Sequence, residues 1–130
     1  MRTKARELAF KLIFERLFVK ENYTDDEEFF VSLKKQEDKD FSKEILNQFL
    51  LHREELSSII SSHLVGYELD RVYKVDLALM YEALTEIYYL QTPCQIAINE
   101  IVELSKQYST EKSKRFINGV LSSIMKDLNK

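Results

Sequence analysis

Glycine and proline are scarce in this chain, which has two glycines and one proline in 130 residues. Average usage is about 7% glycine and about 5% proline. The turns of β-sandwiches and barrels, and the phosphate loops of nucleotide-binding α/β domains, require glycine at set positions. We therefore expect an all-α protein. Apolar residues make up 45% of the chain and charged residues 32%, which is the balance of a folded domain, and the length predicts a single domain spanning residues 1–130.

Cysteine and histidine are too few for several common kinds of site. The single Cys94 excludes an internal disulfide and a thiolate zinc cluster. His52 and His63 are eleven residues apart, or about three helical turns, which is too far to share a metal ion, so we expect surface or cap residues. No uncharged run approaches about 18 residues, and the charged N-terminus lacks the apolar core of a signal peptide. The interpretation is a cytoplasmic protein without a metal or cofactor.

Charge is segregated along the chain. The formal net charge is −3, but residues 1–20 carry +4, residues 21–105 carry −11 and residues 106–130 carry +4. Two basic ends would form one positive surface if they met in space, and such a surface favours a nucleic-acid partner. Charge alone leaves open the alternative that these lysines and arginines are ordinary solvated groups.

Apolar residues recur at three- and four-residue steps through most of the chain, as in amphipathic helices. Thr24-Asp25-Asp26-Glu27 forms a capping-box pattern, and Gly66 and Pro93 are stop signals. Residues 36–40 are expected to be a polar connection. The expected helices cover residues 4–20, 24 to about 35, 41 to about 64, 69–91, 96–108 and 110 to the C-terminus.

Phe10, Phe14 and Phe18 follow one another at four-residue steps and widen the apolar surface of the first helix. Burial in the protein's own core is the default interpretation of such a stripe. The alternative is that part of the stripe contacts a partner protein.

No set of residues suggests catalysis. The chain lacks a nucleophile elbow and a glycine-rich phosphate loop. Cys94 has no basic neighbour in sequence and is expected to be inert, although a reactive thiol is left open. We therefore predict a binding protein, not an enzyme.

Basic residues at both ends of the chain are candidates for RNA contacts, because clustered cations bind phosphates and release counterions. In the last helix they lie next to Phe116, and cations beside an aromatic ring are typical of single-stranded RNA sites. The alternative for Phe116 is a core ring, since it lies on the apolar side of its helix. The basic candidates are Arg2, Lys4 and Arg6, then Lys112, Lys114 and Arg115.

Asn118 and Gly119 lie in the middle of the last predicted helix. Glycine in a helix interior costs about 1 kcal/mol relative to alanine, so we expect a close helix–helix approach at Gly119 to offset that cost. Asn118 is expected to bond a neighbouring backbone, with direct RNA contact as the alternative for both residues. Asn99 and Glu100 are likewise expected to be caps or buried polar groups.

Two C-terminal segments resemble the signature of the NusB family of transcription antitermination factors. Residues 93–108, PCQIAINEIVELSKQY, are similar to the family pattern P-x-x-V-A-I-N-E-A-V-E-L-A-K-x-F-G, and SKRFINGVL at 113–121 is similar to S-x-x-F-V-N-G-V-L. The N-terminal Ala5-Arg6-Glu7-x-Ala9 resembles the family start A-R-E-x-A. His63-Leu64, Tyr67 and Arg71 resemble H-L-x-x-W-x-x-x-R, with tyrosine in place of tryptophan. The resemblance covers nearly the whole chain.

This resemblance implies about seven helices in two packed bundles and a non-enzymatic RNA-binding factor. Members of the family bind the boxA element of nascent ribosomal RNA together with NusE, a small-subunit ribosomal protein, within an RNA polymerase antitermination complex. Carried over, the RNA contacts are Arg2, Lys4, Arg6, Ser113, Lys114 and Phe116, and the NusE contacts are Phe14 and Asp76. Lys112 joins the RNA set from charge and proximity alone. Some relatives resemble dimers, which leaves a homodimer open.

The chain departs from the family in one helix, where Leu77, Tyr81 and Thr85 replace two arginines and a tyrosine. That departure keeps a second hypothesis open, a helical protein–protein adaptor that has lost RNA binding. A third is the helical RNA-anchoring domain of a ribosomal RNA methyltransferase. We expect no such enzyme, because the chain ends at Lys130 without a methyl-donor domain.

Overall fold

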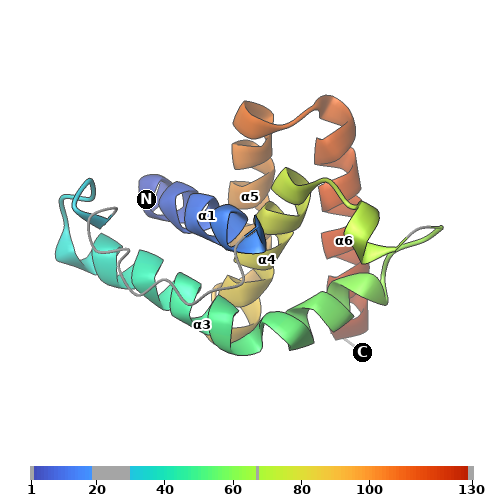
Figure 1. The fold of residues 1–130 in the computed structure, drawn as a ribbon, viewed down its shortest axis with the longest axis horizontal. Helices are drawn as coiled ribbons and strands as arrows, with labels where there is room; N and C mark the ends of the chain where they lie inside the picture. Colours follow the sequence, from blue (N-terminus) through green and yellow to red (C-terminus); the bar gives the residue numbers. More distant parts are fainter. Residues whose placement is uncertain (1, 19–29, 67, 129–130) are drawn as a thin grey trace.

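The computed structural model describes residues 2–18, 30–66 and 68–128, which are helical throughout apart from their connections (Figure 1). Over these residues it has five α-helices, fewer than the seven or so expected, and one 3₁₀ turn, η1. Residues 24–29 of the expected second helix lie outside the described residues. Within the described ranges, no helix is both long enough and apolar enough to cross a membrane. The elements are α1 (Thr3–Phe18), α3 (Gln36–Ser61), η1 (Leu69–Arg71), α4 (Lys74–Tyr89), α5 (Cys94–Tyr108) and α6 (Glu111–Leu128).

Three expected boundaries were wrong. The second expected helix does not run to about residue 35, because residues 31–35 form a turn and an irregular connection before α3. Residues 36–40 are the first turns of α3 and not a connection, because Glu37 and Asp38 favour the positive end of the helix dipole and Gln36 Nε2 donates to Asp40 Oδ1 at 2.9 Å. Residues 69–91 are not one helix, because Val72 and Tyr73 adopt extended backbone between η1 and α4. Val72 is buried, so the extended residue pair places one apolar side chain in the core.

Helix α4 is the central helix of the structure (Figure 1). It packs against α1, α3, α5 and α6, and every residue from Asp76 to Glu86 is buried. A helix buried on all sides is expected to be apolar around its whole circumference. Leu77, Tyr81 and Thr85 all fall inside this run, so the departures from the family pattern alter the core and not an exposed surface.

Charged groups nevertheless lie inside this core. Arg6 of α1 is buried and pairs with the fully buried Glu86, its Nε donating to both carboxylate oxygens at 3.1 and 2.9 Å and its Nη2 to Oε1 at 3.0 Å. Thr92 Oγ1 adds a fourth hydrogen bond to Glu86 at 3.1 Å. Burial alone would lower the pKa of Arg6, but the hydrogen bonds and charge of Glu86 outweigh burial and raise it. Arg6 therefore stays ionised beside the Glu86 carboxyl group.

Glu82, one helical turn before Glu86, is also fully buried. Neither of its carboxyl oxygens has a hydrogen-bond partner among the described residues. Burial, followed by the nearby Glu86 carboxylate, raises the pKa of Glu82 well above its ordinary value of 4.5. Glu82 is therefore held in its neutral form in the folded protein.

Two histidines hold α3 to other helices, one at its internal kink and one just after its C-terminal end. The helix kinks at His52, whose ring stacks on Tyr89 of α4 at 3.8 Å between centroids. Just after the helix, His63 donates to the Ile59 carbonyl at 2.7 Å and to Asp127 of α6 at 2.6 Å. Those two acceptors, the carbonyl foremost, raise the pKa of His63. His63 thus caps α3 and ties it to α6.

We predict that Glu82→Gln removes a pH-dependent loss of stability. The unfolded chain releases the Glu82 proton as pH rises past about 4.5, whereas the folded chain keeps it. The free energy of unfolding of the wild type should therefore fall by up to about 1.4 kcal/mol per pH unit above that point from this group. Glutamine cannot ionise. In urea unfolding experiments, the free energy of unfolding of the variant should therefore rise steadily relative to that of the wild type as pH rises.

Glu103→Gln is the matched control, because Glu103 lies on the exposed surface of α5. A stability difference between Glu82→Gln and wild type that stays constant from pH 5 to pH 8 would contradict a neutral Glu82.

Candidate nucleic-acid interface

A surface hollow lies where the first turn of α6 faces η1 and the start of α4. Its volume is about 440 Å³, within the range of about 300–1,000 Å³ that small ligands occupy. We refer to it as the α6 hollow. Four of the residues selected from the sequence, Asp76, Lys112, Ser113 and Phe116, lie in its wall. The complete lining is Arg71, Val72, Tyr73, Asp76, Thr110, Lys112, Ser113 and Phe116.

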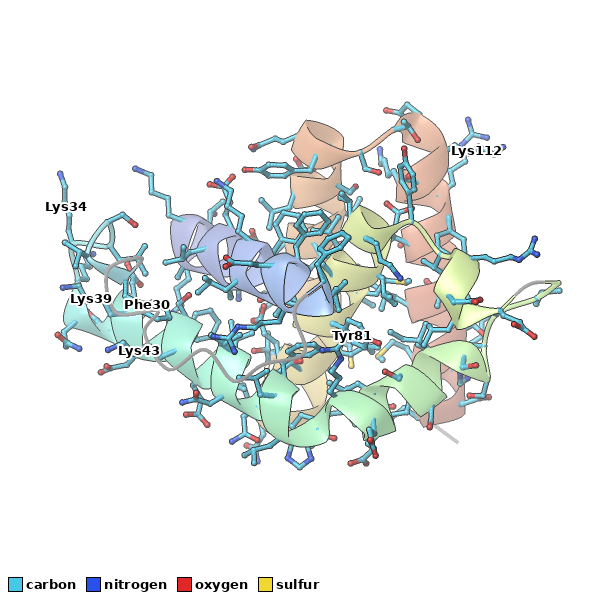
Figure 2. All side chains as sticks on the ribbon, in the orientation of Figure 1. Phe30, Lys34, Lys39, Lys43, Tyr81 and Lys112 are labelled. Atoms are coloured by element: carbon cyan, nitrogen blue, oxygen red, sulfur yellow. The ribbon has the colours of Figure 1, made fainter. Side chains whose placement is uncertain are left out.

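Thr110 determines how the residues of α6 are presented to this hollow. Its Oγ1 accepts the backbone N–H of Ser113 at 3.1 Å, an N-cap bond that starts the helix at Glu111. With that start, Lys112 is exposed while Ser113 is buried, and the Ser113 hydroxyl accepts from Thr110 at 3.3 Å. Ser113 therefore helps to form the cap, and Lys112 is the cation that reaches solvent (Figure 2).

Asp76 has an internal partner. It is only 4% exposed, and its Oδ1 accepts from Ser109 Oγ at 2.8 Å. This bond joins the start of α4 to the link between α5 and α6, and so supports the wall of the α6 hollow. A contact between Asp76 and a partner protein stays a prediction, and its burial limits the surface available for one.

The three basic residues at the N-terminus lie in different surroundings. The Arg2 guanidinium lies 4.4 Å from the centre of the Phe41 ring of α3, and Lys4 is exposed. Arg6 points into the core and binds Glu86. As an RNA contact Arg6 stays an untested prediction, while its observed role is internal. Only Arg2 and Lys4 of this group present exposed side chains.

The two basic ends do not meet. Helix α1 begins near the start of α3, as the contact between Arg2 and Phe41 shows, whereas Lys112 lies at the opposite side of the molecule (Figures 1 and 2). The condition for one merged basic surface, that the two ends meet in space, is therefore not met among the described residues. The reason is that α4 stands between α1 and α6 and packs against both.

The C-terminal end of α5 lies between α1 and the start of α6. Tyr108 OH donates to Glu7 Oε2 of α1 at 2.8 Å, and its ring lies 5.1 Å from that of Phe10 and 5.6 Å from Lys11 Nζ. The exposed side of α1 thus borders the α5–α6 link, directly before the α6 hollow. Sequence reasoning missed Lys11, Tyr108 and Tyr73 as neighbours of the site. Only the helical contacts between distant segments reveal them.

The phenylalanine stripe of α1 turns gradually from core to surface. Phe10 is buried, Phe14 is half-buried against the core, and Phe18 is 61% exposed. Phe14 and Phe18 meet edge to face with ring centroids 5.0 Å apart. The core interpretation is therefore confirmed for the first ring, whereas the last ring is exposed and its contact with a partner protein stays a prediction.

Gly119 does not mark a close helix–helix approach, so that expectation was wrong. Gly119 is exposed, and a Cβ added to it would meet no atom within 4 Å. Asn118 is exposed as well, and Asn99 accepts from Gln95 Nε2 at 3.1 Å on the surface of α5. In the part of the chain that the structure describes, no group of three or more His, Cys, Asp or Glu side chains is placed to hold a metal ion.

The family model described as the NusB family matches residues 3–126. The transcription antitermination protein NusB of Finegoldia magna is 46% identical over 90 residues, which cover 68% of this chain and 66% of that protein. The corresponding protein of Cyanothece is 44% identical over 93 residues, covering 71% of this chain and 44% of its own length. The chain thus spans less than two thirds of these two relatives. NusB of Listeria innocua is 33% identical over 95% of this chain and 94% of its own length.

Solved structures give the same similarity in three dimensions. NusB of T. maritima superposes with a TM-score of 0.88 at 26% identity, covering 97% of this chain and 91% of that one. A structure of the antitermination factors NusB and NusE in complex with double-stranded RNA contains a chain that superposes with a TM-score of 0.85 at 29% identity. The match covers 97% of this chain and 96% of that chain.

We predict that Arg6→Ala destabilises the fold by about 3–5 kcal/mol, because it leaves the buried Glu86 carboxylate without its cation. Lys4→Ala, at an exposed position on the same helix, should change the free energy of unfolding by no more than about 0.5 kcal/mol. Urea unfolding at pH 7 measures both. Equal stabilities for the two variants would show that the Arg6–Glu86 pair does not hold α1 to α4.

Proposed function

The chain belongs to the NusB family, and from this premise we propose that it is a non-catalytic transcription antitermination factor that binds RNA together with the ribosomal protein NusE. The observation that carries the proposal is the α6 hollow, which places cations and aromatic rings at the family's S-x-x-F segment. A related NusB is held with NusE and RNA in a solved complex.

The α6 hollow has the composition of a nucleotide site. Arg71 and Lys112 are exposed cations on its two sides, suited to phosphate oxygens. Tyr73, 68% exposed, and the half-buried Phe116 supply aromatic faces on which an unstacked base can lie. We propose that Lys112 and Phe116 contact RNA here, with Ser113 holding the turn that presents them. Lys114, which is partly buried and does not line the hollow, is proposed to contact RNA beside it. Arg2 and Lys4 would contact a more distant part of the strand.

We propose single-stranded RNA as the form that enters this hollow. Bases inside an A-form duplex are stacked, and their major-groove edges are out of reach of side chains, whereas a single strand can turn a base outward. The boxA element of ribosomal RNA leaders and an RNA polymerase antitermination complex are the finer parts of the same proposal. They follow from the family resemblance.

The NusE surface is proposed at the end of α1. Phe14 and Phe18 form an edge-to-face pair of rings that passes from the core to solvent. Exposed aromatic side chains are typical anchors of protein interfaces.

We also propose that residues 1–130 act as one domain made of two bundles that share α4. Support comes from the packing: α1, α3 and α4 contact one another on one side, while α5 and α6 contact each other and α4 on the other. A single core cluster runs through both groups. Binding of NusE at α1 and binding of RNA at α6 would then be coupled through α4.

We predict that Phe116→Leu weakens RNA binding by about 1–3 kcal/mol, because leucine keeps an apolar side chain but removes the stacking face. Lys112→Ala should weaken binding and lower the log–log salt slope by about one unit, the signature of a lost phosphate contact. Titrations of a fluorescent boxA-like single strand at several salt concentrations measure both.

Lys126→Ala is the matched control for charge, since Lys126 is exposed near the other end of α6. If wild-type protein and Lys112→Ala bound the strand with the same affinity and salt slope, the α6 hollow would not be an RNA site. A failure of the wild type to bind RNA with or without NusE would favour the adaptor hypothesis.

We predict that Phe18→Asp lowers the affinity for NusE at least about tenfold, or about 1.4 kcal/mol, without unfolding the protein, because Phe18 is exposed. Leu51→Asp places the same charge at an exposed apolar position of α3, 73% exposed, and should leave NusE binding unchanged. Calorimetric titration with NusE, together with thermal unfolding of each variant, tests the surface. Equal losses for the two variants would place the interface elsewhere.

A further inference from the structure

His63 is held between two acceptor groups at the point where the C-terminal ends of α3 and α6 meet (Figure 1). Its Nδ1 lies 2.7 Å from the Ile59 carbonyl oxygen of α3, and its Nε2 lies 2.6 Å from Oδ2 of Asp127 in the last turn of α6. The side chain of His63 is only 14% exposed, whereas that of Asp127 is 57% exposed. The ring is therefore enclosed, and its contact with α6 opens to solvent on the carboxylate side.

The two contacts together require a proton on each ring nitrogen. A carbonyl oxygen and a carboxylate oxygen only accept hydrogen bonds, and a neutral imidazole has a single N–H. Both bonds therefore exist at the same time only when His63 is the doubly protonated, positively charged imidazolium. In the neutral form, one ring nitrogen would present its lone pair to an acceptor less than 3 Å away, so that contact has to open.

The surroundings of His63 favour its charged form. Helix α3 has no basic residue in its last turn, so His63 is the first cation beyond the C-terminal end of α3, where the helix dipole is negative. The pKa of His63 is raised from its ordinary value of 6.5, first by the hydrogen bond to the Ile59 carbonyl and then by Asp127, against the opposing effect of burial.

The other titratable and charged groups near this contact leave Asp127 as the partner that sets the charge of His63. Arg115 of α6 lines the same hollow as His63, but lies roughly 18 Å from Asp127 along the helix axis. Tyr88 of α4 lies near Asp127, and burial foremost raises the pKa of Tyr88 above its ordinary value of 10. Tyr88 therefore stays neutral over the pH range in which a histidine titrates.

Ser62 gives the neutral state of His63 a way to form. Its Oγ donates to the Ile59 carbonyl at 3.0 Å and lies 3.2 Å from Nδ1 of His63. The Ile59 carbonyl therefore keeps a donor when the ring withdraws, and the Ser62 hydroxyl is within reach of the deprotonated Nδ1. The proton on Nε2 stays with Asp127, but without the positive charge that bond loses about half of its strength.

We propose that His63 is a pH-operated clamp, in which the protonated ring holds the end of α3 against the end of α6 and loss of the Nδ1 proton to solvent loosens this junction. His63, Leu64 and Val65 form one wall of a hollow of about 310 Å³ whose other wall is α6. The clamp therefore determines how closely the segment after α3 lies against α6. It is a property of the fold, so its test requires no RNA.

The direction of the pH dependence follows from the raised pKa of His63 in the folded protein. The unfolded chain releases this proton near pH 6.5, whereas the folded chain keeps it to higher pH. The stabilisation from the clamp is therefore fully present below pH 6.5 and is lost as pH rises through the pKa of the folded state.

An NMR titration of the His63 ring from pH 5 to pH 9 tests the protonation step, with the ring signal assigned by its absence from His63→Gln. We expect a midpoint above 6.5 in the wild type and a lower midpoint in Asp127→Asn, which lacks the carboxylate charge. Glu111→Gln is the matched control, because Glu111 is exposed in the first turn of α6, and it should leave the midpoint unchanged. A wild-type midpoint at or below 6.5, or equal midpoints in the wild type and Asp127→Asn, would overturn the clamp.

Thermal unfolding and hydrogen exchange test the junction itself. His63→Gln should lower the melting temperature by about 2–8 °C at pH 6, where the charged ring makes both bonds, and by less than half as much at pH 9. The effect of Glu82 is common to both proteins and cancels in this difference. The amides of His63 and Leu64 donate to the carbonyls of Ile60 and Ser61 at 3.0 and 3.3 Å, and their protection factors should fall over the same pH range in the wild type. A melting-temperature difference that stays constant from pH 6 to pH 9, or protection factors that do not change with pH, would show that protonation of His63 does not control the junction.

Discussion

The ion pair between Arg6 and Glu86 is the interaction on which the arrangement of helices depends. Helix α4 is buried on every side, yet it carries two carboxyl groups at full burial. A buried charge is costly unless it is paired and hydrogen-bonded. Glu86 meets that requirement through Arg6 and Thr92. Glu82 avoids the cost of a buried charge because its raised pKa keeps it neutral. Because Arg6 comes from α1 and Thr92 from the link before α5, one carboxylate joins three elements.

This central helix also determines where charge can appear on the surface. With α1, α3, α5 and α6 packed around α4, the basic ends of the chain are kept on different sides of the molecule (Figure 1). A single merged patch would bring like charges together, whereas two separated basic regions can follow the backbone of an extended strand. The link from α5 to α6 lies between these two basic regions. Asp76 holds this link, and α1 contacts it through Tyr108.

Much of the fold could be predicted from the sequence, because helical periodicity and scarce glycine are local properties. The helices that became α1, α5 and α6 were expected near their observed limits. The break at Val72 and Tyr73 was not, since no glycine or proline marks it and its cause is the burial of Val72 among distant helices. The site was partly predicted for the same reason. Lys112 and Phe116 stand in a recognisable motif, whereas Tyr73 lines the hollow only through tertiary packing. Lys11 lies beside Tyr108 for the same reason, and the burial of Arg6 depends on a residue 80 positions away.

The two glycines of the chain differ in what the structure requires of them. Gly66 has a φ of +89°, a conformation that other residues rarely adopt, so the chain geometry accounts for it. Gly119 has helical backbone and open space around it, and neither conformation nor packing accounts for it. Gly119 therefore weakens α6 by about 1 kcal/mol relative to alanine, and no close helix contact at this position offsets that cost.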